Sequence, residues 1–302
     1  MMTQLLAKPL QIATVSAVLL AIATSATQAA SLTWNYAADS SSDGISALGV
    51  GSLSENEMFG LAYAQDSENI YFAFNSNLSL GGSNPWGDFF LNFNYWQNPS
   101  IDSSLTNGNL LAVHFDADNQ SGATQGLGLY QLNPNDSLLF TADFANYDEY
   151  NQPVWESGGQ VTNITGLGIG ESQNYLGAYG RSVMGSGTKI GDIQLFEQNQ
   201  LTLLGLDFSR QPLGSSIFGF SFARSLLPDG NLDWIGHVMA QSGADTMGII
   251  GQFQPGSAFP PPPNLDPTPS PNPDPNPQSV PEPSALMAMV VALVGFCTRK
   301  SR

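Results

Sequence analysis

An alternation of apolar residues with small or polar ones runs from about residue 32 to residue 251 and constrains the fold more than any other feature. A period of two residues places alternate side chains on opposite faces of a β-strand. Residues 59–63 and 70–74 both show this period, and residues 65–68 between them read Gln-Asp-Ser-Glu, which favours a turn. The sequence therefore predicts a β-hairpin at this place.

The other alternating segments are also short, and clusters of Gly, Asn, Pro and Ser separate most of them. Further strands are predicted at residues 89–95, 110–115, 127–132, 138–141, 192–196, 217–222, 234–240 and 247–250. Many short strands favour a single all-β domain of roughly ten strands, a β-sandwich or jelly roll, with a barrel as the alternative. One short helix is predicted at residues 197–204. Residues 156–187, rich in Gly and Ser, are predicted to form long loops.

The charge balance excludes one class of partner. Lys and Arg number 8 against 25 Asp and Glu, and the formal net charge is -17. Only Arg181, Lys189, Arg210 and Arg224 lie in the predicted β-domain, which is too few to neutralise a phosphate backbone. We expect no nucleic-acid partner. The same acidity suits an extracellular protein and attracts divalent cations.

Both ends of the chain read as targeting sequence. Residues 1–30 combine Lys8, an apolar stretch at 12–23 and small residues at 25–30, which is the plan of a secretory signal peptide. We expect export by the general secretion machinery and cleavage after Ala29 or Ala30. A buried N-terminal helix is the alternative, but it would give the small-residue pattern no purpose. Cys297 is the single cysteine, so a packed core rather than an intramolecular disulfide must stabilise the exported domain.

A proline-rich stretch follows the predicted domain. Within residues 257–279, the segment 260–277 alternates proline with small or polar residues, and it has almost nothing apolar to bury. We expect a polyproline II linker that spans on the order of 50 to 60 Å. Such a linker would hold the domain away from a membrane or wall layer.

Residues 280–302 form a three-part terminal segment. Pro281, Glu282 and Pro283 precede an apolar run at 285–297, and a basic tail follows with Arg299, Lys300 and Arg302. Prolines prevent a helix upstream, and basic residues favour retention on the cytoplasmic side of a membrane. A short transmembrane helix is therefore predicted, although a buried terminal helix is the usual interpretation of a run this short. Behind an extended linker, such a helix has no core within easy reach.

This arrangement resembles the PEP-CTERM sorting signal, whose Pro-Glu-Pro motif corresponds here to Pro281, Glu282 and Pro283. The resemblance implies that an exosortase, a membrane-embedded enzyme with a catalytic cysteine, processes the chain near this motif and passes it outward. The expected location is therefore transient anchoring in the inner membrane, followed by the cell surface or the extracellular space.

The middle of the chain resembles a group of cyanobacterial exosortase-dependent surface proteins. The resemblance rests on residues 34–40 (Trp-Asn-Tyr-Ala-Ala-Asp-Ser), 70–78 (Ile-Tyr-Phe-Ala-Phe-Asn-Ser-Asn-Leu), 86–93 (Trp-Gly-Asp-Phe-Phe-Leu-Asn-Phe) and 186–192 (Ser-Gly-Thr-Lys-Ile-Gly-Asp). It supports export and a surface location, and it implies no catalytic mechanism.

Few residues are available for catalysis. His114 and His237 both fall in strand-like runs, where ordinary half-buried histidines explain them, and no second ligand lies at a metal-site spacing. The sequence contains no Gly-x-Ser-x-Gly, His-Glu-x-x-His or phosphate-loop motif. A glycoside hydrolase would need a carboxylate pair, for example from Asp88, Asp116 and Asp118. We expect a protein that is not an enzyme and that has no cofactor, calcium excepted.

Two loops contain candidate calcium ligands. Asp116, Asp118 and Asn119 place oxygen atoms before Gly122, as in the first half of a calcium loop, but the closing glutamate is missing. Residues 39–44 (Asp-Ser-Ser-Ser-Asp-Gly) form a second, weaker candidate. Asp and Asn also favour plain turns, which is the simpler interpretation of both.

Two tryptophans are candidates for sugar stacking. Trp96 and Trp155 adjoin Asn-Pro or Gln-Pro loop signals, whereas core packing explains most of the other aromatic residues. The leading hypothesis is a structural or adhesive surface domain. The alternative is a carbohydrate-binding module that takes an extracellular polysaccharide as its partner.

Overall fold

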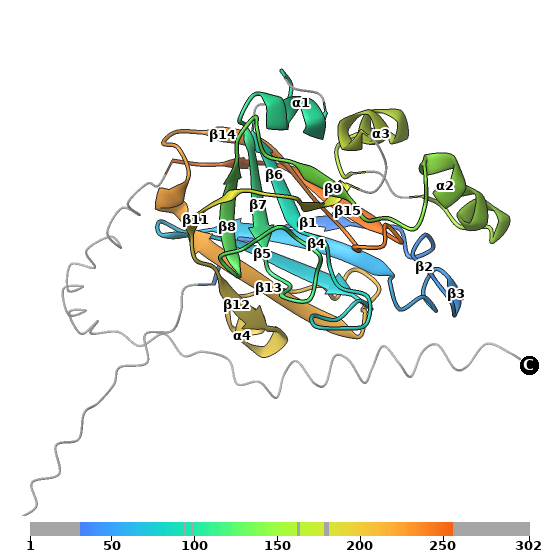
Figure 1. Ribbon diagram of the computed structural model, residues 1–302. Helices are drawn as coiled ribbons and strands as arrows, with labels where there is room; N and C mark the ends of the chain where they lie inside the picture. Colours follow the sequence, from blue (N-terminus) through green and yellow to red (C-terminus); the bar gives the residue numbers. More distant parts are fainter. Residues whose placement is uncertain (1–30, 94, 98–99, 162–163, 178–180, 256–302) are drawn as a thin grey trace, which may run out of the picture. The chain divides into compact units, whose positions relative to one another are not determined.

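Antiparallel β-sheet dominates the described part of the chain. The computed structural model describes residues 31–93, 95–97, 100–161, 164–177 and 181–255 (Figure 1). It is 37% strand and 15% helix with antiparallel sheets, which confirms the all-β expectation at the level of a mostly β chain. The predicted signal peptide, the whole linker and the whole sorting signal, with its motif and basic tail, lie outside the described residues.

Fifteen strands lie in the described ranges, more than the roughly ten expected, because several contain only two to four residues. Their bounds are β1 Asn35–Ala38, β2 Ile45–Ser46, β3 Gly49–Val50, β4 Met58–Gln65, β5 Asn69–Ser76, β6 Phe89–Phe93, β7 Leu110–His114, β8 Gly128–Leu132, β9 Leu138–Phe140, β10 Arg181–Met184, β11 Thr188–Gly191, β12 Gln194–Glu197, β13 Ser216–Ala223, β14 Leu232–Met239 and β15 Thr246–Phe253.

Two large sheets contain most of these strands. One has the order β1-β4-β5-β13-β12, and the other has the order β11-β8-β7-β6-β14-β15. All the strand pairs within them are antiparallel. The predicted hairpin is confirmed as β4 and β5, which are joined at residues 66–68. Asp66 closes this turn because its Oδ1 accepts hydrogen bonds from the backbone N–H groups of Glu68 and Asn69.

The main core lies between the two sheets. Phe72 of β5 contacts Phe89 of β6 with ring centroids 4.5 Å apart, and it meets Trp234 of β14 at 5.5 Å. These residues belong to one buried cluster to which both sheets contribute. Each buried ring of this kind stabilises the fold by about 1.5–3 kcal/mol through the hydrophobic effect. The alternation of apolar residues in the sequence therefore reflects the packing of the two sheets against each other.

The outer faces of both sheets are covered as well. On the five-stranded sheet, Tyr71 and Ala73 of β5 point away from Phe72 and pack in a second cluster with Leu201. On the six-stranded sheet, Phe90 of β6 points away from Phe89 into a third cluster. Strands with two buried faces explain why few charged residues occur in them.

Helices supply much of this cover. They are α1 Ile101–Thr106, α2 Tyr147–Glu156, α3 Ile169–Leu176, α4 Gln198–Leu203 and the 3-10 turn η1 Arg224–Leu226. The predicted helix at 197–204 is confirmed as α4, which packs beside β12 and β13 (Figure 1). No helix in the described ranges is long and apolar enough to cross a membrane.

The prediction of long loops at residues 156–187 is wrong in part. This stretch contains α3 and the strand β10, which pairs with β9. Tyr175 and Leu176 of α3 pack against Ile235 of β14, so tertiary packing overrides the high Gly and Ser content. The helix begins after Gly168, whose N–H donates to Glu171 Oε2 at 2.9 Å.

Candidate functional site

Four acidic residues from three separate segments meet at one end of the two sheets. Asp39 and Asp43 belong to the loop that follows β1, Glu57 comes directly before β4, and Asp245 comes directly before β15. We call these four residues the acidic cluster. One carboxylate oxygen from each of Asp39, Asp43 and Asp245 lies within 4.8 Å of the other two.

The acidic cluster is deeply buried for a set of carboxylates. Asp43, Glu57 and Asp245 are at most 1% exposed, and only Asp39 is half-buried. Ionised carboxylates are almost never buried unless something compensates their charge. The geometry therefore calls for an explanation beyond packing.

Glu57 presents one unsatisfied oxygen to this cluster. Its Oε2 accepts a hydrogen bond from the Gly44 N–H at 2.9 Å, whereas its buried Oε1 has no hydrogen-bond partner in the described part of the chain. Burial, followed by the charge of Asp43, raises the pKa of Glu57 to about 8. Oε1 therefore lies near the charge of Asp43 and has no hydrogen-bond partner of normal geometry among the described residues.

Asp245 anchors the cluster to the strand ends. Its Oδ2 accepts from the Met58 N–H at 2.7 Å, and its Oδ1 accepts from the Thr246 N–H at 2.7 Å. Burial raises its pKa well above the usual value, and the charges of Asp43, Asp39 and Glu57 raise it further. Either bound protons or a cation must offset the charge of this cluster.

Close backbone packing brings the loop to Glu57. A Cβ added at Gly44 would lie 2.6 Å from Glu57 Cα and 2.8 Å from Glu57 Oε2, so only glycine fits there. The loop is held on the other side by Tyr150 of α2, whose hydroxyl donates to the Asp43 carbonyl at 2.9 Å. The Ile45 N–H donates to the Ala244 carbonyl at 2.9 Å, which ties the loop to the β14–β15 turn.

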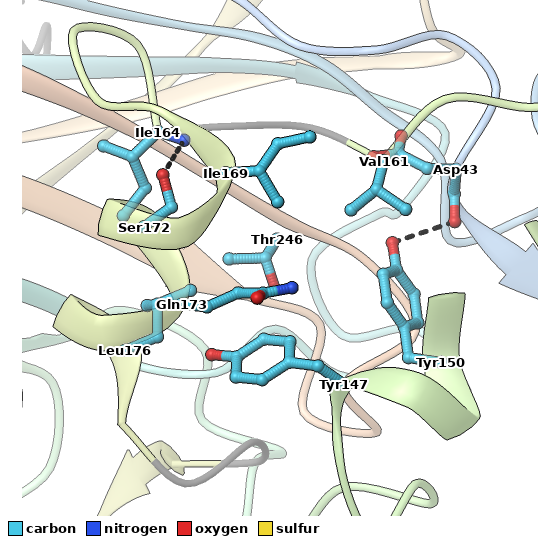
Figure 2. Close-up of a pocket in the computed structure, with 10 residues that line it drawn as sticks. All are labelled: Asp43, Tyr147, Tyr150, Val161, Ile164, Ile169, Ser172, Gln173, Leu176 and Thr246. Atoms are coloured by element: carbon cyan, nitrogen blue, oxygen red, sulfur yellow. Dashed lines mark hydrogen bonds between the residues drawn. The ribbon is translucent and has the colours of Figure 1, made fainter. Parts of the chain in front are cut away.

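A small cavity adjoins the acidic cluster between α2 and α3. Figure 2 shows Asp43 beside Tyr150 at one side of it, Ser172 and Leu176 of α3 at the other side, and Thr246 between them. Its volume is about 30 Å³, which is room for a water molecule and not for a sugar or another organic ligand. Buried Thr246 Oγ1 has no hydrogen-bond partner among the described residues. The cavity is thus an extension of the cluster rather than a substrate pocket.

In the predicted calcium loop at residues 116–122, the side-chain oxygens of Asp116 and Asn119 are bonded to backbone N–H groups. Asp116 Oδ2 accepts from the Trp86 N–H at 3.0 Å, and its Oδ1 accepts from the Asp118 N–H at 3.2 Å. Asn119 Oδ1 accepts from the Ser121 N–H at 2.9 Å, which is an Asx turn. Asp118 is exposed. Among the described residues, the side chains close enough together to hold a metal ion are Asp39, Asp43 and Asp245, and none of them belongs to this loop.

Asp88 and the histidines are buried in structural contacts. Asp88 Oδ1 lies 3.0 Å from His114 Nδ1, and its Oδ2 accepts from the Met184 N–H at 2.8 Å. His237 Nδ1 lies 3.2 Å from the Tyr175 hydroxyl. Both histidines are at most 5% exposed, so the expectation of half-buried side chains is wrong. Sequence position alone did not show that both faces of their strands are covered.

The two predicted stacking tryptophans are both exposed but lie on different elements. Trp96, in the turn after β6, is 70% exposed and stacks on Tyr95 with ring centroids 4.2 Å apart. Trp155 is 57% exposed and lies on α2. Trp96 and Tyr95 line a groove of about 180 Å³ with Glu171 and Asn174 of α3. We call this groove the aromatic groove.

Sequence reasoning found half of the acidic cluster. The spacing of Asp39 and Asp43 before Gly44 was noted as the weaker calcium candidate, whereas Glu57 and Asp245 were missed. The available signal was an acidic residue directly before an apolar strand, Glu57 before Met58 and Asp245 before Thr246 and Met247. No protein-family model, no curated protein and no solved structure matches the chain.

Proposed function

We propose that the chain is an exported, exosortase-processed protein of the cell surface or extracellular matrix, and that its β-domain has a structural or adhesive role. The observation that carries this proposal is the order of Pro281-Glu282-Pro283, the apolar run and the basic tail, combined with the signal-peptide pattern at the other end. The partners are the general secretion machinery, an exosortase and, transiently, the inner membrane.

The architecture of the described residues supports a self-standing surface domain. We assign the two packed sheets to the β-sandwich class, a common architecture of cell-surface modules. Helices, loops and short strands cover the outer faces, so the domain is stabilised by a core and needs no disulfide. An acidic module with a packed core, on a proline-rich linker, fits a role in which the domain is presented at the cell surface.

Fractionation of the native host tests the processing step. A variant with Pro281→Ala, Glu282→Ala and Pro283→Ala should accumulate in the inner membrane, because the resemblance makes these residues the recognition motif. The wild-type chain should reach the surface or the medium. A matched control is Pro271→Ala with Pro273→Ala in the linker, which should leave export unchanged. Normal release of the motif variant would contradict the proposal.

A second candidate function is carbohydrate binding at the aromatic groove. Trp96 offers an exposed ring face for a sugar, and Glu171 and Asn174 place polar groups beside it. Aromatic faces with adjacent hydrogen-bonding groups are suited to saccharides, which carry both apolar C–H faces and hydroxyl groups. Trp155 lacks a place in this groove.

Glycan-array binding discriminates between the two functions. If the groove binds polysaccharide, Trp96→Ala should weaken binding by about tenfold or more, which corresponds to about 1.4 kcal/mol. Trp155→Ala, which removes an equally large exposed ring elsewhere, is the control and should bind like the wild type. Absence of binding by the wild-type protein to any polysaccharide would leave the structural or adhesive role alone.

A further inference from the structure

We propose that the acidic cluster of Asp39, Asp43, Glu57 and Asp245 is a calcium site that fastens the loop after β1 to the starts of β4 and β15. The inference goes beyond the proposed function and does not depend on it. It rests on four features of the described residues: ligand spacing, ligand chemistry, a buried acceptor without a donor, and the elements that the site joins.

The spacing fits one ion. Calcium binds oxygen ligands at about 2.3–2.6 Å, so two ligands of the same ion lie at most about 5 Å apart. The oxygens contributed by Asp39, Asp43 and Asp245 all fall within 4.8 Å of one another. Glu57 lies beside this group of three rather than within it, and its Oε2 accepts a hydrogen bond from the N–H of Gly44, the residue that follows Asp43.

The chemistry of the donors selects a hard cation. The cluster contains carboxylates and no histidine or cysteine, so it does not suit zinc or copper. Magnesium demands near-ideal octahedral geometry and keeps several waters, whereas calcium accepts many carboxylates in an irregular shell. Three of the four side chains are fully buried, which favours the ion that sheds its water more readily.

Glu57 supplies the independent observation. Its Oε1 is buried in a side chain of 0% exposure, and it has no hydrogen-bond partner at normal distance and angle among the described residues. A buried carboxylate oxygen without a donor is costly, and a coordinated cation would satisfy it. Exposed acidic groups on a surface carry no such penalty, so this cluster differs from an ordinary acidic patch.

The site joins segments that are remote in sequence. Asp245 accepts a hydrogen bond from the N–H of Met58, which is 187 residues away in the sequence. The loop at 39–44 is a third segment, separate from both. An ion bound to all three would cross-link β1, β4 and β15 at one end of the fold.

The purified full-length protein provides the test. Its Tm should rise by about 5 °C or more between excess chelator and about 5 mM calcium chloride, because an ion that binds only the folded state stabilises it. The same concentration of magnesium should give a clearly smaller shift. Equilibrium dialysis should give close to one bound calcium ion per chain at this site.

The decisive variant is Glu57→Gln. Its amide retains an acceptor for the Gly44 N–H and places a donor where Oε1 stands, so in chelator this variant should be at least as stable as the wild type. It should lose most of the calcium-induced Tm shift. Asp43→Asn should behave likewise and serves as a second variant if Glu57→Gln does not fold.

Matched controls separate the cluster from the general acidity of the protein. Glu55→Gln removes an exposed carboxylate two residues from Glu57, and Asp118→Asn changes the other candidate loop. Both should keep the full calcium shift. The proposal is overturned if calcium leaves the wild-type Tm unchanged, or if Glu57→Gln and Asp43→Asn respond to calcium as the wild type does.

Discussion

At the scale of single residues, burial decides the chemistry of the ionisable side chains. His237 on β14 is 1% exposed, and burial lowers its pKa to about 3. Its Nδ1 meets the Tyr175 hydroxyl, and its Nε2 has no hydrogen-bond partner in the described part of the chain. The folded protein therefore keeps this imidazole neutral over the whole physiological range of pH.

This burial predicts acid lability with a definite sign. Between about pH 6.5 and pH 3, the unfolded chain binds a proton at His237 that the folded chain does not bind, so stability falls as the pH falls below 6.5. The contribution is about 1.4 kcal/mol per pH unit. His237→Gln should therefore show a shallower loss of unfolding free energy between pH 6.5 and 4.5 than the wild type. Denaturant titrations at several pH values measure it, and equal slopes would contradict the assignment.

At the scale of elements, most of the longer strands were predictable, whereas α1, α2 and α3 were not. Alternating residues located β4, β5, β13 and most strands of the second sheet, because period two records the two faces of a strand directly. The helix α2 carries its own signals, since Asn146 caps it and Tyr150 and Val154 lie four residues apart on its buried side. Pro153 and the Gly-rich segment that begins after Glu156 concealed them. Short helices such as α2 and α3 form because they pack on a sheet, which local sequence does not report.

The same limit applies to the candidate site. Residues 39–44 were recognisable as oxygen-rich, but their partners come from the starts of two other strands. Only the antiparallel pairing of β1 with β4, and the turn between β14 and β15, bring Glu57 and Asp245 to this loop. Conversely, the loop at 116–122 resembles a calcium loop in sequence, but the side-chain oxygens of Asp116 and Asn119 are bonded to backbone N–H groups. Hydrogen bonds to the backbone distinguish a turn from a ligand set, and they depend on the folded chain.

At the scale of the whole molecule, the sequence suggests the proposed address, and the structure describes the β-domain. The address rests on the order of short segments near the two ends, and the described residues neither include nor depend on them. The domain between them has a core built from both sheets and a buried acidic cluster at one end. If the chain is exported as proposed, an extracellular medium that contains calcium would supply the ion proposed for this cluster.

The central claim is that the chain is exported and processed at both ends, and mass spectrometry of the native protein recovered from the host tests it most directly. The account predicts a chain that begins at Ala30 or Ser31 and ends close to Pro281, Glu282 and Pro283, found outside the cytoplasm. Intact protein from Met1 to Arg302, recovered from the cytosol, would contradict it.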